Sequence, residues 1–232
     1  MAEIAMLNDV SKCIGCRACQ IACKSWNGLS AEKTSQRGTY QNPSRLSADT
    51  WCLVHYTEIV DEKGDLKWLF RREQCYHCRD ATCAAVCPYS AITKTKCGAV
   101  VINNDKCRGC QTCVEACPFH MPQFDGKNVK SRKCTLCYDR LQRGLLPACV
   151  QSCPSQAILF GEREGMLNTA RARVKELGGN ATLYGDRSIH GHVLYVLPEK
   201  PELYEGINLN PQYPLSTALI KLFARLSLLM RS

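Results

Sequence analysis

The sequence lacks the apolar runs that targeting and membrane segments require. Its N-terminal stretch, MAEIAMLNDVSKCIGC, has no uninterrupted apolar run, so we expect no signal peptide of its own. The C-terminal stretch YPLSTALIKLFARLSLLMRS is largely apolar but is broken by Lys221, Arg225 and Ser227, and its clean part is too short to span a bilayer. A glycine-rich nucleotide loop is absent, and so is a nucleophile beside its base. We therefore expect no active site in this chain.

Cysteine, in contrast, is abundant: 18 of the 232 residues, well above the ordinary proportion. Such a number indicates disulfides or metal. A disulfide framework suits short secreted domains that cannot build a core, whereas this chain is long enough for one large or two small domains. We therefore favour metal.

Sixteen of the cysteines form four groups. The groups are Cys13, Cys16, Cys19 and Cys23; Cys75, Cys78, Cys83 and Cys87; Cys107, Cys110, Cys113 and Cys117; and Cys134, Cys137, Cys149 and Cys153. Groups one and three follow C-x2-C-x2-C-x3-C, the run with which bacterial ferredoxins hold 4Fe-4S clusters. Proline follows the last cysteine in three of the four groups, as Pro88 after group two, Pro118 after group three and Pro154 after group four. It fixes φ at the turn beyond the ligand. Gly15 and Gly109 allow the loop backbone to approach sulfur.

Zinc is the main alternative metal, because any C-x2-C pair can be half of a four-cysteine zinc site. Zinc sites usually combine two separated pairs, and they do not call for three thiols within seven residues followed by Cys-Pro. Four such groups favour iron-sulfur clusters. A multi-zinc interaction protein stays the alternative, which metal analysis would separate.

The formal charge of +9 ordinarily suggests nucleic acid or an anionic surface. That count treats cysteine as neutral, whereas an oxidised 4Fe-4S cluster with four thiolates carries about −2. Four clusters bring the total to about +1, so we expect no nucleic-acid partner. Near the cysteine loops lie Lys94, Lys96, Lys130, Arg132 and Lys133, which either stabilise reduced clusters or form a solvated face.

Internal repeats indicate two ferredoxin-like modules. MLNDVSKCIGC at 6–16 resembles VINNDKCRGC at 101–110, and CPYSAI at 87–92 resembles CPSQAI at 153–158. Groups two and three follow one another along the chain with a hairpin-like stretch between them, so we expect them to form one module. By elimination, groups one and four form the other module, which is nested around the first. The resulting fold class is α+β, with two nested bacterial-ferredoxin-like modules that each bind two 4Fe-4S clusters, a β-hairpin insertion and a C-terminal extension. The expected layout is an outer module of 1–24 and 128–160, an insertion at 25–73 with the hairpin, an inner module at 74–127, and a helix, strand and tail at 161–232.

The remaining segments give local expectations. DEKGD separates two strand-like runs and predicts the hairpin, and an amphipathic pattern predicts a helix from Arg163 to Leu177, ended by two glycines. HVLYVL at 192–197 predicts a strand, and His190 and His192 at its start suggest a surface turn. The leftover Cys52 and Cys97 are expected to be buried small residues, although an unusual ligand set including Cys97 is left open.

These motifs resemble a known family: the four-cluster, ferredoxin-type electron-transfer subunits of molybdenum or tungsten bis-pterin oxidoreductases. The resemblance covers about residues 4–205. The stretches CIGCRACQIACKSWN, CTLCYDRLQRGLLPACVQSCPSQAILFG and GHVLYVLPEKPELYEGI look most like the beta subunit of formate dehydrogenases. Subunits of nitrate, polysulfide and dimethyl sulfoxide reductases share the cysteine pattern, so they and hydrogenase complexes form the alternative.

The resemblance implies four clusters in a row, each held by three cysteines of one group and one of another. The implied sets are Cys13, Cys16, Cys19 and Cys153; Cys23, Cys134, Cys137 and Cys149; Cys75, Cys78, Cys83 and Cys117; and Cys87, Cys107, Cys110 and Cys113. It further implies a non-catalytic role, in which electrons pass between a large Mo/W bis-pterin subunit and a membrane cytochrome, a quinone site or a soluble carrier.

The same resemblance implies a membrane-associated complex. We expect it on the periplasmic face, carried across by a partner's twin-arginine signal, with the cytoplasm as the alternative. The C-terminal tail is expected to lie on the membrane or a membrane subunit, or to dock on the catalytic partner.

Overall fold

The structure of the chain is a computed structural model that describes residues 2–36, 38–61, 63–186, 189 and 191–212. The expectations for His190 and for the tail at 213–232 lie outside the described residues. None of the helices formed by these residues combines the length and the hydrophobicity that a membrane span requires.

A four-stranded sheet joins the two ends of the described chain. Its strand order is β8, β1, β10, β9, with β1 parallel to β10 and antiparallel to β8. The bounds are β1 Ile4–Asp9, β8 Ile158–Glu162, β9 Thr182–Tyr184 and β10 Val193–Leu197. All five residues of β10 are buried, because one face of the sheet is covered by a helix and the other faces the cysteine-rich core.

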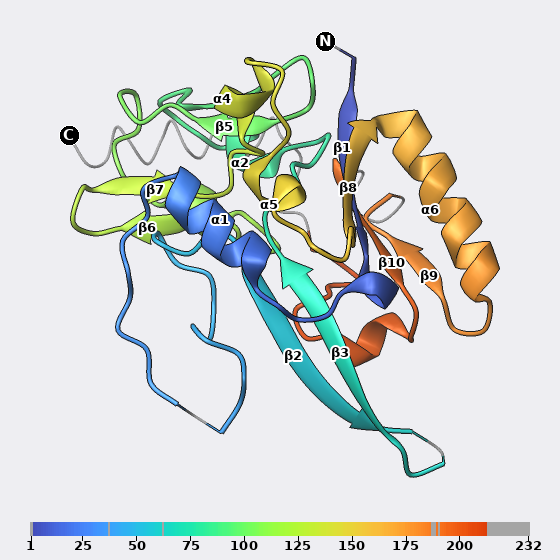
Figure 1. Cartoon of the computed structure of the whole chain (residues 1–232). Helices are drawn as coiled ribbons and strands as arrows, with labels where there is room; N and C mark the ends of the chain where they lie inside the picture. The colour runs from blue at the N-terminus through green and yellow to red at the C-terminus, as the bar shows by residue number, and fades with distance from the viewer. Residues whose placement is uncertain (1, 37, 62, 187–188, 190, 213–232) are drawn as a thin grey trace.

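The covering helix is α6 (Arg163–Leu177), which runs along the sheet in Figure 1. Its buried residues Leu167 and Ala170 pack with Leu7 and Leu194 in one apolar cluster, as the i, i+3 spacing of one helix face dictates. The helix ends at Gly178, whose φ is +62°. The predictions of this helix and of a strand in HVLYVL are confirmed.

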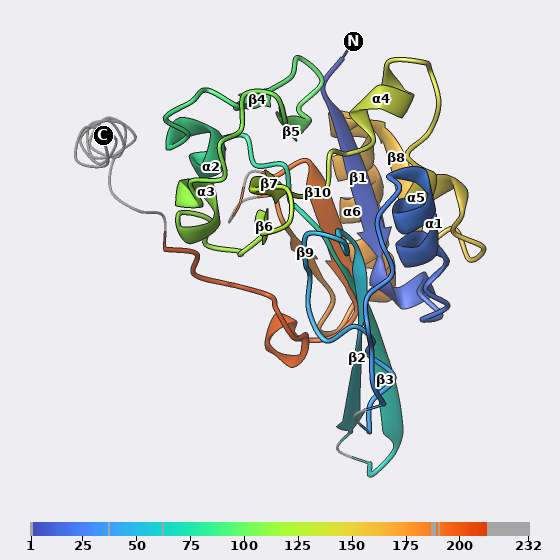
Figure 2. The ribbon, with the colours of Figure 1, turned by 90° about the vertical axis from the view of Figure 1, so that its left-hand side faces the viewer.

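Three two-stranded hairpins complete the β structure described. The longest projects from the rest of the molecule in Figures 1 and 2. Its exposed tip is apolar at Val60 and Leu66, whereas its base is buried. The hairpin strands are β2 Leu53–Val60 with β3 Leu66–Glu73, β4 Ile92–Lys94 with β5 Val100–Ile102, and β6 Gln123–Asp125 with β7 Lys130–Arg132.

The other helices are short, and four of them carry cysteines of the four groups. Helix α1 contacts α5, and α2 contacts α3. The bounds are α1 Ala18–Trp26, α2 Thr82–Ala85, α3 Thr112–Glu115, α4 Tyr138–Leu141 and α5 Ala148–Gln151, with 3-10 turns η1 Val10–Lys12 and η2 Pro201–Leu203. The chain is thus a mixed α/β protein with few helices.

His192 corrects one expectation. The sequence suggested a surface turn, but the His192 side chain is fully buried. Its Nδ1 lies 2.6 Å from the Ile4 carbonyl oxygen, and its ring packs on Gly98, where a Cβ would stand 2.1 Å from the ring. His192 immediately precedes β10, whose residues are all buried, and its imidazole is therefore buried with them. Burial lowers the pKa of His192.

The two leftover cysteines are buried as expected. Cys52 is 2% exposed and Cys97 is 1% exposed. Cys97 lies in the turn between β4 and β5, where its carbonyl accepts a hydrogen bond from the Ile4 N–H.

Candidate metal centres

The C-x2-C loops of all four groups share one backbone feature. The residue before the second cysteine has a left-handed φ in each loop: +66° at Gly15, +48° at His77, +65° at Gly109 and +57° at Leu136. This conformation turns a backbone N–H toward the first sulfur, as in the 3.4 Å contact from Leu136 N to Cys134 Sγ. The repeat seen in the sequence therefore recurs in the backbone.

Glycine is required at two of these positions for space as well as conformation. A Cβ on Gly109 would lie 2.4 Å from the Val129 carbonyl oxygen, and one on Gly15 would lie 3.0 Å from the Phe70 ring. Both distances are shorter than ordinary contacts. At Gly109 the obstacle is backbone, so a larger residue would displace the loop, whereas at Gly15 the Phe70 ring would have to shift by a few tenths of an ångström.

The Cys-Pro turns repeat in the same way. The third residue after the cysteine again has positive φ, at Ser90, His120 and Gln156. In two of these turns the next N–H reaches the cysteine sulfur: Ala91 N lies 3.3 Å from Cys87 Sγ and Met121 N lies 3.5 Å from Cys117 Sγ. Hydrogen bonds of this kind favour the thiolate over the thiol.

Folding brings the sixteen cysteines together in four sets. Each set draws three members from one group and one member from another. Site 1 contains Cys13, Cys16, Cys19 and Cys153; site 2 contains Cys23, Cys134, Cys137 and Cys149; site 3 contains Cys75, Cys78, Cys83 and Cys117; site 4 contains Cys87, Cys107, Cys110 and Cys113. All eighteen cysteines are described, and none of them forms a disulfide.

At sites 1, 2 and 3 the four thiols line a space between the atoms. These spaces measure about 430, 290 and 390 Å³, respectively, including their openings. Among the described residues, no three His, Cys, Asp or Glu side chains converge as the ligands of one ion would. The thiols surround a volume, which suits a 4Fe-4S cube because each thiolate binds a different iron.

Site 4 lies against Ser131 at the start of the group-four segment. The Ser131 N–H is 3.4 Å from Cys107 Sγ, and its hydroxyl is 3.4 Å from Cys113 Sγ. Cys113 also packs with Cys83 and Cys87 in a small apolar cluster that includes Ile92.

Burial makes these thiols hard to ionise in the protein alone. Burial is the main cause and neighbouring thiols of the same site add to it, and together they raise the pKa of Cys113 to about 11, that of Cys137 to about 11 and that of Cys83 to about 12. Metal binding requires thiolates. Iron cations would therefore supply the positive charge that four adjacent buried thiolates need, and the donor set fits a 4Fe-4S cluster at every site.

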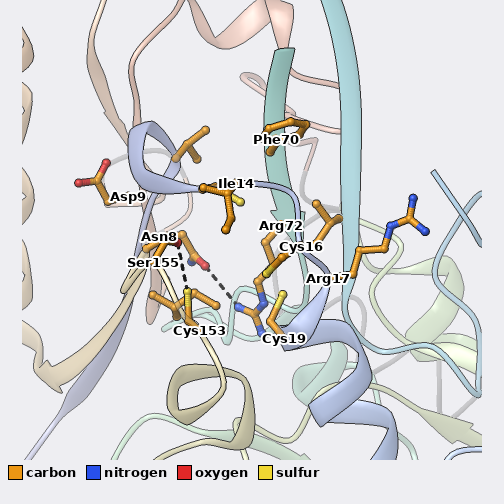
Figure 3. Close-up of a pocket in the computed structure, with 15 residues that line it drawn as sticks. Asn8, Asp9, Ile14, Cys16, Arg17, Cys19, Phe70, Arg72, Cys153 and Ser155 are labelled. Atoms are coloured by element: carbon orange, nitrogen blue, oxygen red, sulfur yellow. Dashed lines mark hydrogen bonds between the residues drawn. The ribbon is translucent and has the colours of Figure 1, made fainter. Parts of the chain in front are cut away.

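Two buried cations stand beside the sites. Arg72 lines both site 1 and site 2, and in Figure 3 it reaches into the space beside Cys19 and Cys153, whereas Arg17 points away. Lys133 lines site 3. Sequence reasoning placed Lys133 only among five basic residues near the loops and missed Arg72. The signal for Arg72 was its position three residues before Cys75, at the end of a strand that enters the core.

Contacts between neighbouring sites arrange them in a series. Helix α1 carries Cys19 of site 1 and Cys23 of site 2, one turn apart. His77, inside the loop of site 3, places Nε2 3.5 Å from Cys134 Sγ of site 2. Sites 3 and 4 meet where Cys83 and Cys113 pack together. The order is therefore site 1, site 2, site 3, site 4.

Comparison with known proteins agrees with these features. Two family models, both described as a 4Fe-4S dicluster domain, match residues 12–91 and 66–163. The chain is 41% identical over 228 residues to the "Formate dehydrogenase, nitrate-inducible, iron-sulfur subunit" of Escherichia coli (strain K12), with 95% of this chain and 77% of that protein covered.

Two further relatives extend the comparison. The chain is 43% identical to the "Formate dehydrogenase iron-sulfur subunit" of Haemophilus influenzae, and the alignment covers 94% of this chain and 73% of that protein. Identity is 36% to the "Formate dehydrogenase 2 subunit beta (cytochrome c-553)" of Nitratidesulfovibrio vulgaris, with 86% of this chain and 95% of that protein covered. With two 4Fe-4S dicluster domains and this identity over most of its length, the chain belongs to the family of formate dehydrogenase iron-sulfur (beta) subunits.

Proposed function

We propose that this chain is the electron-transfer subunit of a formate dehydrogenase complex and that it relays electrons through four 4Fe-4S clusters. The observation that carries the proposal is the gathering of sixteen cysteines into four sets of four. At sites 1, 2 and 3 the thiols surround a space, and at site 4 the four thiols lie near one another. Each of sites 1 to 4 would hold one cluster through its four cysteines.

Strand pairing supports the two nested modules. β5, before group three, pairs with β4, after group two; β1, before group one, pairs with β8, after group four. Matched hydrogen bonds accompany the pairs, from Asn103 N to Ala91 O at 2.7 Å and from Asp9 N to Ala157 O at 2.8 Å. We therefore keep the layout of an outer module at 1–24 and 128–160, an insertion at 25–73, an inner module at 74–127 and an extension at 161–232.

A bound 4Fe-4S cluster takes up and releases one electron at a time. The protein's part is to hold the sites in series, to keep them dry and to direct N–H groups at sulfur. Most of the sixteen thiols are buried or half-buried, and Cys16 of site 1 is exposed. Sites 1 and 4 are the ends of the series, so electrons would enter at one end and leave at the other.

The partners follow from this role. A large molybdenum or tungsten bis-pterin subunit would oxidise formate, and a cytochrome, a membrane quinone subunit or a soluble carrier would take the electrons. The names of the relatives, which include formate dehydrogenase and cytochrome c-553, support both ends of the relay. We propose that the complex is membrane-associated on the periplasmic face and that the tail at 213–232 contacts the membrane or a membrane subunit.

Formate reduction of the purified complex tests the proposal. The complex is isolated anaerobically through a tag on this chain, its other chains are identified by mass spectrometry, and formate is added. We expect a large pterin-containing chain to co-purify, and we expect formate to bleach the visible cluster absorbance of this chain. A cluster-loaded complex that nitrate, polysulfide or dimethyl sulfoxide reoxidises, but that formate does not reduce, would replace the formate assignment with that of another pterin reductase.

A further inference from the structure

Arg72 and Lys133 are unusual because both are cations in the core. Arg72 is 4% exposed and Lys133 is 3% exposed. In the described part of the chain, Arg72 hydrogen-bonds Cys52, Met6 and Asn8, Lys133 hydrogen-bonds two backbone carbonyl oxygens, and neither side chain has a carboxylate partner. A buried charge is unfavourable unless it is paired or close to a metal centre, so these two cations require a counter-charge that the described side chains do not supply.

Arg72 reaches from β3 to the boundary of sites 1 and 2. Its Nε is 3.0 Å from Cys52 Sγ, and its Nη1 is 3.1 Å from Met6 Sδ and 3.3 Å from Asn8 Oδ1. All three are neutral groups that orient the guanidinium without cancelling its charge. The same side chain interacts electrostatically with Cys19 of site 1 and Cys149 of site 2.

Lys133 occupies the next boundary, between sites 2 and 3. Its ammonium donates hydrogen bonds to the carbonyl oxygens of Val100 and, at 3.1 Å, Cys134. Its electrostatic partners are Cys75 and Cys83 of site 3 and Cys134 of site 2. Lys133 is thus the counterpart of Arg72 one step along the series.

We propose that the fixed positive charges of Arg72 and Lys133 raise the reduction potentials of the neighbouring clusters. Arg72 would act on the clusters of sites 1 and 2, and Lys133 on those of sites 2 and 3. This inference rests on the proposed function, and it makes site 2, which borders both cations, the site that responds to both. Each cation lies between two sites, where its charge acts on both.

The sign follows from charge. A 4Fe-4S site with four thiolates carries about −2 when oxidised and gains one negative charge on reduction. A fixed cation nearby therefore stabilises the reduced state more than the oxidised state. In the core the local dielectric is low, so the effect is larger than that of a surface lysine, which solvent and salt screen.

Potentiometric titration followed by EPR tests the inference on the anaerobic complex. Arg72→Met should lower the midpoint potentials of the clusters at sites 1 and 2. Lys133→Met should lower the midpoint potentials of the clusters at sites 2 and 3, so the cluster at site 2 should respond to both variants. We expect at least a tenfold fall in the reduced-to-oxidised ratio at fixed applied potential, which is about 59 mV for a one-electron couple. The cluster that responds to neither variant should be that of site 4.

Lys106→Met is the matched control. Lys106 also immediately precedes a cluster cysteine, Cys107, but it is exposed, so its removal should leave every potential within error. Arg72→Lys, which keeps the charge, should retain potentials closer to those of the parent than Arg72→Met. If Arg72→Met does not load iron, Arg72→Gln replaces it, since an amide can still bond Cys52 and Asn8 without the charge.

The outcomes separate the inference from the function beneath it. If fully iron-loaded Arg72 and Lys133 variants keep all four parental potentials, or if Lys106→Met shifts them equally, the inference is wrong while the relay stands. If the parent chain itself holds no iron, the proposed function fails first, and that is read from metal content rather than from potentials.

Discussion

Arg173 on helix α6 places its Nε 2.9 Å from Oδ2 of Asp9, the last residue of β1. The Asp9 carboxylate is almost fully buried, and its other oxygen accepts bonds from the Ser11 N–H at 3.2 Å and the Ser11 hydroxyl at 2.5 Å. Asp9 therefore closes β1 and shapes the turn that leads to Cys13. Through this contact the peripheral helix supports the first loop of site 1.

Arg173→Met should destabilise the protein, because it leaves the Asp9 carboxylate buried with fewer partners. We expect a loss of about 1–2 kcal/mol, seen as a lower Tm of the anaerobic protein. Arg171→Met is the control, since Arg171 is 54% exposed, its partner Glu164 is exposed, and its other partner Asp186 keeps an ion pair with Arg163. Exposed ion pairs contribute little to stability. Equal effects of the two substitutions would contradict the assignment.

Gly109→Ala should reduce iron binding at site 4. The new methyl group would stand 2.4 Å from the Val129 backbone oxygen, in a residue with φ of +65°, so the loop that holds Cys107 and Cys110 must move. Gly144→Ala has the same backbone strain, with φ of +72°, but no atom within 4 Å. It should lose about 1–2 kcal/mol of stability and keep its full iron content. Iron per chain, measured by mass spectrometry, distinguishes them.

Leu167→Ala should lower the stability of the sheet without changing the clusters. Leu167 is 2% exposed and packs with Ala5, Leu7 and Leu194 on the face away from the cysteine core, and truncation of such a side chain costs about 2–5 kcal/mol. Asn168→Ala, on the exposed side of the same helix, should leave Tm nearly unchanged. A large loss of iron in folded Leu167→Ala would show that α6 has a closer role at the sites than its packing implies.

Cys83→Ser and Cys97→Ser should differ sharply although the two cysteines are only fourteen positions apart in the sequence. Cys83 lines site 3, so its replacement should reduce the iron content and alter one EPR signal. Cys97 is buried beside Thr95 in the β4–β5 turn, with its sulfur 3.2 Å from the Thr95 hydroxyl, and its replacement should retain all iron. Loss of a cluster in Cys97→Ser would revive the unusual ligand set that the sequence left open.

The sequence predicted most of the local structure around these sites because the cysteine spacing and the Cys-Pro turns are local signals. The helix at Arg163–Leu177 and the strand in HVLYVL were equally visible from periodicity and end signals. Parallel pairing of β1 with β10 was not predicted, because it joins residues nearly two hundred positions apart and leaves no trace in a local pattern.

The charged residues show where sequence reasoning fails. Lys12, Lys106 and Lys133 all immediately precede a cluster cysteine, yet the first two are exposed and only Lys133 is buried. Lys133 is buried because it contacts Val100 and lies near Cys75 and Cys83, which are 33 to 58 positions earlier in the sequence, and no local motif encodes these contacts. Arg72 and His192 were missed for the same reason, since tertiary packing alone decides their burial.

Metal analysis of the anaerobically purified parent chain tests the central claim most directly. Four 4Fe-4S clusters held by sixteen cysteines predict about sixteen irons and about sixteen acid-labile sulfides per chain, with brown absorbance. A folded chain that is colourless, poor in iron and rich in zinc would contradict the account.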